Sequence, residues 1–567
     1  MRRKPSRVLL ATTIAAGLAL AACGGDDDDR AVSTAATQAA PATSQEPAGT
    51  QPPASTDDAE PAGAQPPAST DDAEPAAGAG TTAPADDRAT DPDGTLRMAT
   101  FASLYWDPAV QPSGYTISFL GLVYDRLVHT AADGTLVPGL AEAWEYDADA
   151  TTLTLHLRDG VTFQDGAPFD AGAVKANLDR AMTLETSTVK PDLARVGEVV
   201  VVDPSTVELR LTSPDATLPA VLSGNAGAMA SPAALSDPEL DLHPVGTGPF
   251  TLASFQPDSD FALERWDGYW NPDIIHVKRM EVRVLPDTSA RVNALRTGEI
   301  DLAPIEPSDV ETLDGTDDIE VLVPQTLRYV YLAMNLAESP LENLQVRQAI
   351  SHAIDRQALV DSLFHGLGEP TVQPWPAGYF PHVEELQDEY PYDPDRAREL
   401  LAEAGYPDGF SAEIIAVPQP LVYAQLGEAV QAQLAEIGID LTVKITEASA
   451  LGQAFYTDKT AAFALLYTNG AIDPANTVGS RFSANGFFNP GKFSTPALEE
   501  LYQRSLATTD EAERATVLQD VSREIVEQVL DMPLFFAREP VAVNERVVGY
   551  VPFVTGRTDY RSLGVTP

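Results

Sequence analysis

The stretch GTLVPGLAEAWEYDADATTLTLHLRDGVTFQDGAPFD, residues 134–170, sets the interpretation of the whole chain. Within it, residues 152–158 carry leucine at every second position, the alternation of a strand that buries one face. Two Asp-Gly turns follow, with a short strand expected over 161–163 between them and a helix over 171–182 after the second. The residues themselves therefore predict a hairpin that leads into a helix, and they suggest no catalysis.

The same stretch resembles the signature region of a known family, the extracellular solute-binding proteins of ABC importers, family 5, of the dipeptide, oligopeptide and nickel type. The shared positions lie in LVPGLAEAW (136–144) and LTLHLRDGVTFQDGAPFDAGAV (153–174), in one order. Matches in VGTGPF (245–250), LRTGEIDL (295–302) and VRQAISHAIDR (346–356) extend the resemblance over residues 94–567. It implies an α/β, two-lobed, periplasmic-binding-protein-like fold of class II, with an extra small domain and a cleft between lobes.

The expected domains follow from length and from this resemblance. The chain has 567 residues, more than one hydrophobic core serves, so several lobes are expected. The resemblance implies that the glycines of 245–250 form a crossing between lobes, in a backbone geometry that glycine adopts at low energetic cost. It also implies that residues 531–536 form a strand that returns to the first lobe. The expected boundaries are a lipoprotein signal peptide at 1–23, a disordered Ala/Pro/Asp-rich linker at 24–93, lobe I at 94–124 with 246–335 and 526–567, accessory lobe II at 125–245, and lobe III at 336–525.

Secondary structure in the later part of the chain is indicated by periodicity. Residues 283–302 have the pattern strand, helix, strand, which predicts a βαβ unit. Helical spacing of apolar residues is clear over 346–360, 423–437 and 510–529. Strands alternating with helices agree with the α/β class that the resemblance implies.

The N-terminal region predicts export and a lipid anchor. A basic segment at 1–7 precedes an apolar run at 8–20 that is too short for a comfortable membrane span and has the flanks of a signal peptide. The following LAAC (20–23) resembles the bacterial lipobox, in which two acyl chains on the cysteine suffice for stable anchoring. An ordinary cleaved signal with a chance cysteine is the simpler alternative. Because Cys23 is the single cysteine, we expect no intrachain disulfide and a protein anchored by Cys23 to the outer face of the cell membrane, in the periplasmic space.

Composition limits the partners of the chain. Residues 46–59 and 60–73 form a direct repeat of Pro, Ala, Thr, Ser and Asp, too poor in large apolar side chains to offset the entropy of ordering, so a disordered spacer is expected. Lys plus Arg number 36 against 84 Asp plus Glu, a net charge of -48. This balance argues against nucleic acid and against an anionic membrane surface as direct partners.

Ligand contacts are expected from aromatic faces and a few placed polar groups in a cleft that excludes water. Trp106 and Tyr467 match cleft positions of the family and lead the candidates. The segment LYTNGAIDPAN (466–476) resembles a motif of the peptide binders, but Gly470 stands where those proteins carry the Asp that takes the peptide's α-ammonium. An arginine that they place near Val422 for the peptide carboxylate also has no counterpart, so the solute stays open between a peptide, a modified peptide, an oligosaccharide and a metal chelate. The expected ligand-binding residues are Tyr105, Trp106, Trp375, Tyr379, Tyr423, Tyr467, Asn469, Asp473 and Phe482.

No motif in the chain points to chemistry on a bound molecule. We find no Gly-x-Ser-x-Gly, no His-Glu-x-x-His and no cysteine nucleophile in the mature body, and the seven histidines lack close ligand spacing. Two interpretations exist for a polar cluster on 346–356, namely an acid/base site or helix capping with pairing between lobes. The resemblance favours the second, since family members bind without chemistry. The cluster consists of Arg347, His352, Asp355 and Arg356. We expect no enzyme, no cofactor and no metal.

The leading hypothesis is a lipid-anchored receptor of an ABC importer. It would capture a small solute in the cleft, close its lobes about a hinge, and deliver the solute to permease subunits in the membrane as a monomer. The first alternative is a binding or regulatory module of the cell envelope with the same fold and no transporter. The second is an enzyme such as a secreted hydrolase, which turnover of a bound solute would favour.

Overall fold

The structure, a computed structural model, describes residues 88–567 apart from 112–116, 314, 419, 420 and 469. The expected signal peptide, Cys23 and most of the expected linker therefore lie outside the described residues. The described part belongs to one unit, Ala77–Pro567. Order begins before residue 94, because the Arg88 guanidinium donates to the Val547 carbonyl at 2.7 Å and Asp91 N donates to the Val565 carbonyl at 2.7 Å. Residues 88–93 are thus part of the folded body.

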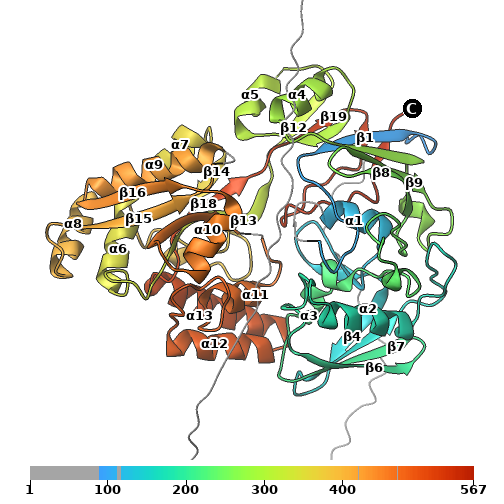
Figure 1. Cartoon of the computed structure of the whole chain (residues 1–567), viewed down its shortest axis with the longest axis horizontal. Helices are drawn as coiled ribbons and strands as arrows, with labels where there is room; N and C mark the ends of the chain where they lie inside the picture. Colours follow the sequence, from blue (N-terminus) through green and yellow to red (C-terminus); the bar gives the residue numbers. More distant parts are fainter. Residues whose placement is uncertain (1–87, 112–116, 314, 419–420, 469) are drawn as a thin grey trace, which may run out of the picture. The chain divides into compact units, whose positions relative to one another are not determined.

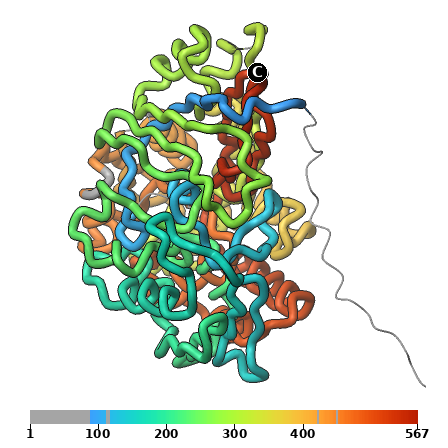
Figure 2. The backbone as a smooth tube through the Cα atoms, turned by 90° about the vertical axis from the view of Figure 1, so that its right-hand side faces the viewer, coloured from blue at the N-terminus to red at the C-terminus, as the bar shows by residue number. Residues whose placement is uncertain are grey.

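Lobe I is built on a mixed sheet of seven strands among the described residues, in the order β12-β19-β11-β1-β10-β9-β8 (Figure 1). The central strand β1 pairs in parallel with β10 and with β11, and α4 connects those two strands. The βαβ unit expected over 283–302 is thereby confirmed. The C-terminal segment runs beside β1 (Figure 2). The bounds are β1 Thr95–Thr100, α1 Ile117–Val123, β8 Phe250–Gln256, β9 Asp260–Arg265, β10 Arg279–Val284, α4 Thr288–Arg296, β11 Leu302–Pro304, α5 Val310–Leu313, β12 Ile319–Leu322, β19 Val541–Asn544, β20 Val547–Val548 and β21 Gly564–Val565.

Lobe III contains a second large sheet, six strands of the described chain in the order β14-β18-β13-β17-β15-β16. Strand β13 is almost fully buried because β17 and β18 flank it. The helix expected over 346–360 is two helices, since Asp355 starts the second by accepting from Ala358 N at 2.9 Å. The bounds are β13 Gln325–Met334, α6 Leu344–Ala353, α7 Arg356–Leu363, β14 Gly368–Pro370, α8 Pro394–Glu403, β15 Phe410–Ala416, α9 Leu421–Ala435, β16 Ile439–Ile445, α10 Ala448–Gly452, β17 Phe463–Tyr467, α11 Pro474–Thr477, α12 Pro496–Ala507, α13 Glu511–Glu527 and β18 Pro533–Arg538.

Two short segments join these sheets. Residues 323–324 lead from β12 of lobe I into β13 of lobe III, and residues 539–540 lead from β18 back into β19. The strand expected over 531–536 to return to lobe I is therefore a strand of lobe III, and β19 makes the return. By sheet membership, lobe III spans 325–538 and not 336–525, because β13 and β18 hydrogen-bond to each other and to its other strands.

Lobe II is a four-stranded sheet of the described chain, in the order β4-β5-β7-β6, covered by α2. The leucine alternation of β5 buries Leu153, Leu155 and Leu157 as predicted. Residues 161–163 form no strand, so the hairpin prediction is wrong: β5 pairs with β4 and β7, and 161–169 is a loop that bonds to itself. The bounds are β2 Val128–Thr130, β3 Leu136–Pro138, β4 Ala141–Tyr146, β5 Thr152–Leu157, α2 Ala171–Thr183, β6 Val196–Asp203, β7 Thr206–Leu211 and α3 Leu218–Val221.

The glycines of 245–250 lie where the chain returns from lobe II to β8 of lobe I, so the expected crossing is found at this place. The physical reason differs from the expected one, since neither Gly246 nor Gly248 has a positive φ. A Cβ on Gly246 would lie 2.2 Å from the Val123 carbonyl oxygen, and a Cβ on Gly248 would lie 2.6 Å from the Val123 carbonyl carbon. Close approach of two backbones therefore demands glycine here.

Candidate functional site

A cavity of about 670 Å³ lies between lobe III and the other two lobes. This volume is in the range of sites for small molecules. Lobe I contributes Gln111, Ile117 and Arg557, and lobe III contributes β13, the ends of β17 and the segment 470–488. The lobe II wall contributes Thr188, Val189, Asp192, Ala220, Val221 and Asn225. Because two crossings join the lobes that form the walls, the arrangement is suited to closure about a hinge.

The lobe III wall is aromatic, with seven aromatic side chains among the described residues. Tyr423 and Tyr467 stack with their ring centroids 5.8 Å apart and an interplanar angle of 24°. Tyr467 remains 44% exposed, so the stack presents an open face to the cavity. Such a face suits an apolar or planar part of a solute. The seven are Tyr329, Tyr331, Trp375, Tyr423, Tyr456, Tyr467 and Phe488.

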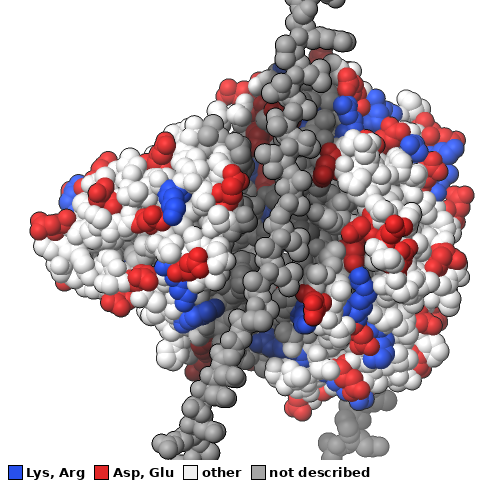
Figure 3. Space-filling view, viewed as in Figure 1, with Lys and Arg blue, Asp and Glu red and all other residues white. Residues whose placement is uncertain are grey.

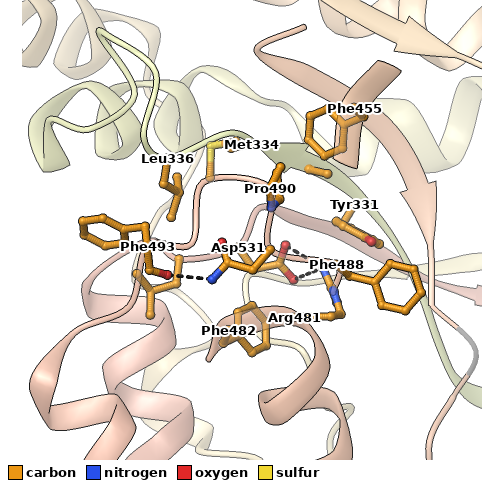
Figure 4. A pocket seen from close by; sticks show the side chains of 13 residues that line it. Tyr331, Met334, Leu336, Phe455, Arg481, Phe482, Phe488, Pro490, Phe493 and Asp531 are labelled. Carbon is orange, nitrogen blue, oxygen red and sulfur yellow. Dashed lines mark hydrogen bonds and ion pairs between the residues drawn. The ribbon is translucent and has the colours of Figure 1, made fainter. Parts of the chain in front are cut away.

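Arg481 brings a buried positive charge to the same wall. It lies on the π-helical segment Val478–Phe482, and such segments are frequent at functional sites. Its Nη2 donates to both Asp531 oxygens at 3.0 Å, and its guanidinium lies 3.8 Å from the Tyr331 ring centroid (Figure 4). Its Nη1 donates to the Tyr329 hydroxyl. Burial alone would lower the pKa of Arg481, but the Asp531 carboxylate raises it above the usual range. The charge is therefore permanent and neutralised within lobe III.

Asp473 lines the cavity with a carboxylate that the protein already uses. One oxygen accepts from Ala475 N at 2.9 Å and caps α11, and Arg514 donates to both oxygens at 2.7 and 2.8 Å. Burial alone would lower the pKa of Arg514, yet the Asp473 carboxylate raises it. The pair stabilises the segment that follows β17 and leaves Asp473 little capacity for a ligand.

The structure brings four of the expected ligand-binding residues to the cavity: Trp375, Tyr423, Tyr467 and Asp473. The prediction that Trp106 lines the cleft is wrong. It is fully buried in the core of lobe I, edge-on to Phe255 and Phe261 with centroids 6.1 and 5.4 Å away.

The remaining expected residues lie elsewhere. Tyr105 is 51% exposed and does not belong to the described lining of the cavity. Tyr379 lies behind the wall, where its hydroxyl donates to the Ile472 carbonyl. Phe482 is buried beside Arg481, against a space of about 20 Å³, about the size of one water. Asn469 lies outside the described residues.

Gly470 occupies a position that its backbone restricts. Its φ is +63°, in the left-handed region that glycine adopts at low cost, and a Cβ there would lie 3.2 Å from Arg328 Cγ. The lobe III wall therefore has no carboxylate at the place where the resemblance located the ammonium-binding Asp of peptide binders.

Sequence reasoning missed several lining residues. Tyr329 and Tyr331 carried a usable signal, because residues two apart on a strand share a face. Arg481 and Asp192 carried none, since each reaches the cavity only through the meeting of distant segments.

The polar cluster on 346–356 is structural. Asp355 caps α7, as expected, but the arginines pair within lobe III and not between lobes. Arg347 donates to the carbonyls of Gln528 and Leu341 at 2.6 and 2.9 Å, and Arg356 donates to the Pro533 carbonyl at 2.8 Å. These contacts hold α6 and α7 against the end of α13 and the start of β18.

Acidic and basic side chains are interspersed on the face seen in Figure 3. Within residues 88–567 and their gaps, no group of three or more His, Cys, Asp or Glu side chains is placed to hold a metal ion. None of the helices in the described part has both the length and the apolar character needed to cross a bilayer.

Comparisons with known proteins agree with this architecture. The model of the family described as bacterial extracellular solute-binding proteins, family 5 Middle, matches residues 135–489. The glutathione-binding protein GsiB of Shigella dysenteriae serotype 1 is 31% identical over 434 residues, which are 72% of this chain and 82% of that protein. The periplasmic binding protein DppA from Helicobacter pylori, in complex with the peptide STSA, superposes with a TM-score of 0.72 at 25% identity, over 84% of this chain and 98% of that one. NikA from Brucella suis, in complex with Fe(III)-EDTA, gives a TM-score of 0.74 at 25% identity, over 84% and 100% of the two chains.

Proposed function

Because the chain belongs to the bacterial extracellular solute-binding proteins of family 5, we propose that it is the lipid-anchored substrate-binding component of an ABC importer. Membership makes it an extracytoplasmic binding protein and not an enzyme. The observation that carries the proposal is the cavity of about 670 Å³, in which an aromatic wall of lobe III faces a more polar wall of lobe II.

Transport requires a receptor whose conformation changes when it binds the solute. A solute that contacts both walls binds the closed arrangement better than the open one, so it shifts the population towards closure. The segments 323–324 and 539–540 are the hinge in this scheme, because each joins a strand of one sheet to a strand of the other. The closed form then delivers the solute unchanged to the permease subunits.

The solute is a small peptide-like or other organic molecule. Relatives are named for glutathione or hold a peptide or a metal chelate in their structures, and the cavity size supports the same range here. Aromatic faces and the neutralised Arg481–Asp531 pair support recognition by stacking and hydrogen bonding on the lobe III side.

Binding is tested by mass spectrometry of what co-purifies with the full chain, followed by titration calorimetry with the compound found. Tyr467→Ala should weaken binding about tenfold, because it removes the open ring of the stack. Tyr105→Ala is the matched control, a tyrosine of similar exposure outside the described lining, and should bind normally. A chain that carries no solute and binds no member of the family's range would refute the receptor function.

The anchor rests on the LAAC motif that ends at Cys23. Two acyl chains on this cysteine would hold the protein on the membrane, and residues 24–87 would serve as a spacer. Cys23→Ala should move the protein from the membrane fraction to the soluble fraction in its own host. An unmodified N-terminal mass in the wild type would contradict the anchor.

The second candidate is an envelope module of the same fold without a transporter. Gly470, at the place of the peptide binders' charged contact, is the observation that favours it. Uptake of the co-purified solute separates the two, since deletion of the chain abolishes uptake only if a permease uses it.

A further inference from the structure

Two carboxylates belong to the described lining of the cavity, Asp192 and Asp473. The two carboxylates differ in the partners that they have within the protein. Asp473 is held by Arg514 and caps α11. The Asp192 side chain accepts no hydrogen bond and makes no ion pair with any other side chain in the part of the chain that the structure describes, although it is exposed to the space between the lobes.

The backbone that carries Asp192 is held firmly. It lies between α2 and β6, where Asp192 N donates to the Val189 carbonyl at 3.1 Å. Val189 and Leu193 on either side are buried in the core of lobe II. Thr188 N donates to the Ala109 carbonyl at 2.8 Å and so ties the segment to lobe I. The carboxylate is thus presented to the cavity from a fixed position, which lowers the entropic cost of binding to it.

Closure of the cavity raises the free-energy cost of keeping the Asp192 carboxylate charged. Its surroundings are already partly desolvated, and burial raises the pKa of Asp192 while the Arg557 guanidinium lowers it. When the lobes approach and water leaves, a carboxylate without a close countercharge is destabilised, because it loses its hydration without gaining a partner. The countercharge must come either from the solute or from a basic side chain of the protein.

We propose that Asp192 is the countercharge for an ammonium group of the solute, so that this receptor selects amine-bearing solutes through its lobe II wall. The proposal rests on the solute-binding function above and adds a substrate class and a specificity-determining residue to it. The lobe III wall has Gly470 at the position where peptide binders carry their ammonium-binding Asp, so charge recognition has moved to the opposite side of the cavity. The body of the solute then lies on the Tyr423–Tyr467 stack.

The test uses the full chain and three matched pairs of probes, each an amine and its N-acetyl form: glutathione, the tetrapeptide Ser-Thr-Ser-Ala, and phenethylamine. Titration calorimetry compares the wild type with Asp192→Asn and with Glu185→Gln. Asn keeps the shape of Asp and removes the charge. Glu185 is an exposed acid of lobe II outside the described lining, so its substitution removes the same charge elsewhere.

At least one amine should bind the wild type, and its N-acetyl form should bind about tenfold more weakly or worse, a loss of about 1.4 kcal/mol for each factor of ten. Asp192→Asn should weaken the amine by the same factor and change the acetyl form by no more than about twofold, and Glu185→Gln should change neither. Thermal unfolding of Asp192→Asn should match that of the wild type, because within the described chain the side chain has no hydrogen bond and no close ion pair to lose.

Each other result is decisive. An acetyl form that binds as well as its amine, or an amine that binds Asp192→Asn normally, overturns the role of Asp192 and leaves the receptor function intact. If no probe binds, the co-purified solute decides: a basic amine supports the proposal, and a solute without one overturns it. Failure of every probe together with the absence of any co-purified solute overturns both this proposal and the receptor function.

Discussion

Asp125→Asn is expected to be among the most damaging conservative substitutions in lobes I and II. The Asp125 side chain is fully buried, and four side-chain donors converge on it, in addition to the backbone N–H of Arg126 at 3.1 Å. They are Arg561 Nη1 at 2.9 Å, His129 Nε2 at 2.5 Å, the Tyr269 hydroxyl at 2.9 Å and Trp270 Nε1 at 2.7 Å. These donors come from the start of lobe II, from the segment after β9 and from the C-terminal segment, so one carboxylate joins three distant parts of the chain.

The magnitude follows from the contacts. Asparagine keeps the shape but removes the charge, and its amide nitrogen turns one acceptor into a donor that faces other donors. Removing one partner of a buried ion pair costs about 3–5 kcal/mol. Arg561 keeps Asp559, to which its Nη2 donates at 2.7 Å, so we expect the lower end, about 3 kcal/mol of unfolding free energy.

The assay is denaturant unfolding at pH 7 followed by tryptophan fluorescence. Four of the five tryptophans lie between residues 106 and 270, so the signal reports mainly on lobes I and II. The control is Asp179→Asn, which removes an exposed pair with Lys175 on α2 and should cost no more than about 0.5 kcal/mol. A loss below about 1 kcal/mol for Asp125→Asn would refute the reasoning, since removing one partner of a buried charge pair costs about 3–5 kcal/mol.

Three further predictions concern stability. The unfolding free energy should fall as the pH drops below about 6.5, because burial lowers the pKa of His129 and the unfolded chain therefore binds that proton first. It should fall further below about pH 4, because burial would raise the pKa of Asp559 but Arg561 lowers it to about 2. An unfolding free energy that stays constant from pH 7 to pH 3 would contradict this prediction. Gly246→Ala should lower the thermal midpoint by several degrees because its Cβ meets a backbone oxygen at 2.2 Å, whereas Gly452→Ala, with nothing within 4 Å of its Cβ, should not, and equal midpoints would count against the close approach. Trp106→Ala should lower the unfolding free energy by about 3–5 kcal/mol and leave the solute affinity measured by calorimetry unchanged. Weakened binding with normal stability would instead support Trp106 as a ligand-binding residue.

Local patterns in the chain were sufficient for most of the secondary structure. The leucine alternation of 152–158 predicts β5 and its buried face, because side chains two apart on a strand share a face. Asp170 and Asp355 begin helices through their side-chain caps, a contact between neighbours in sequence. Motif resemblance supplied the α/β class and the existence of two lobes joined by crossings.

The failures have one physical origin. Residues 161–163 have strand composition, but the neighbouring edge of β5 is taken by β7, from residues 206–211. Likewise β18 joins lobe III because β13 offers it a partner more than 190 residues earlier in the chain. Trp106 was predicted to line the cleft, but Phe255 and Phe261 pack against it in the core of lobe I. Each outcome depends on which distant segment arrives at the site.

By itself, the order of residues determined the family, the class of the fold, the acidic balance of the whole chain and the motif at Cys23, since these depend on composition and on patterns of near neighbours. Only the tertiary structure decided which polar groups already have partners. Asp473 and Asp192 look alike in the sequence, yet Arg514 reaches one of them across 41 residues and no side chain pairs with the other within the described chain. A charge interacts with whatever packing brings within a few ångströms, and neighbours in sequence do not determine that.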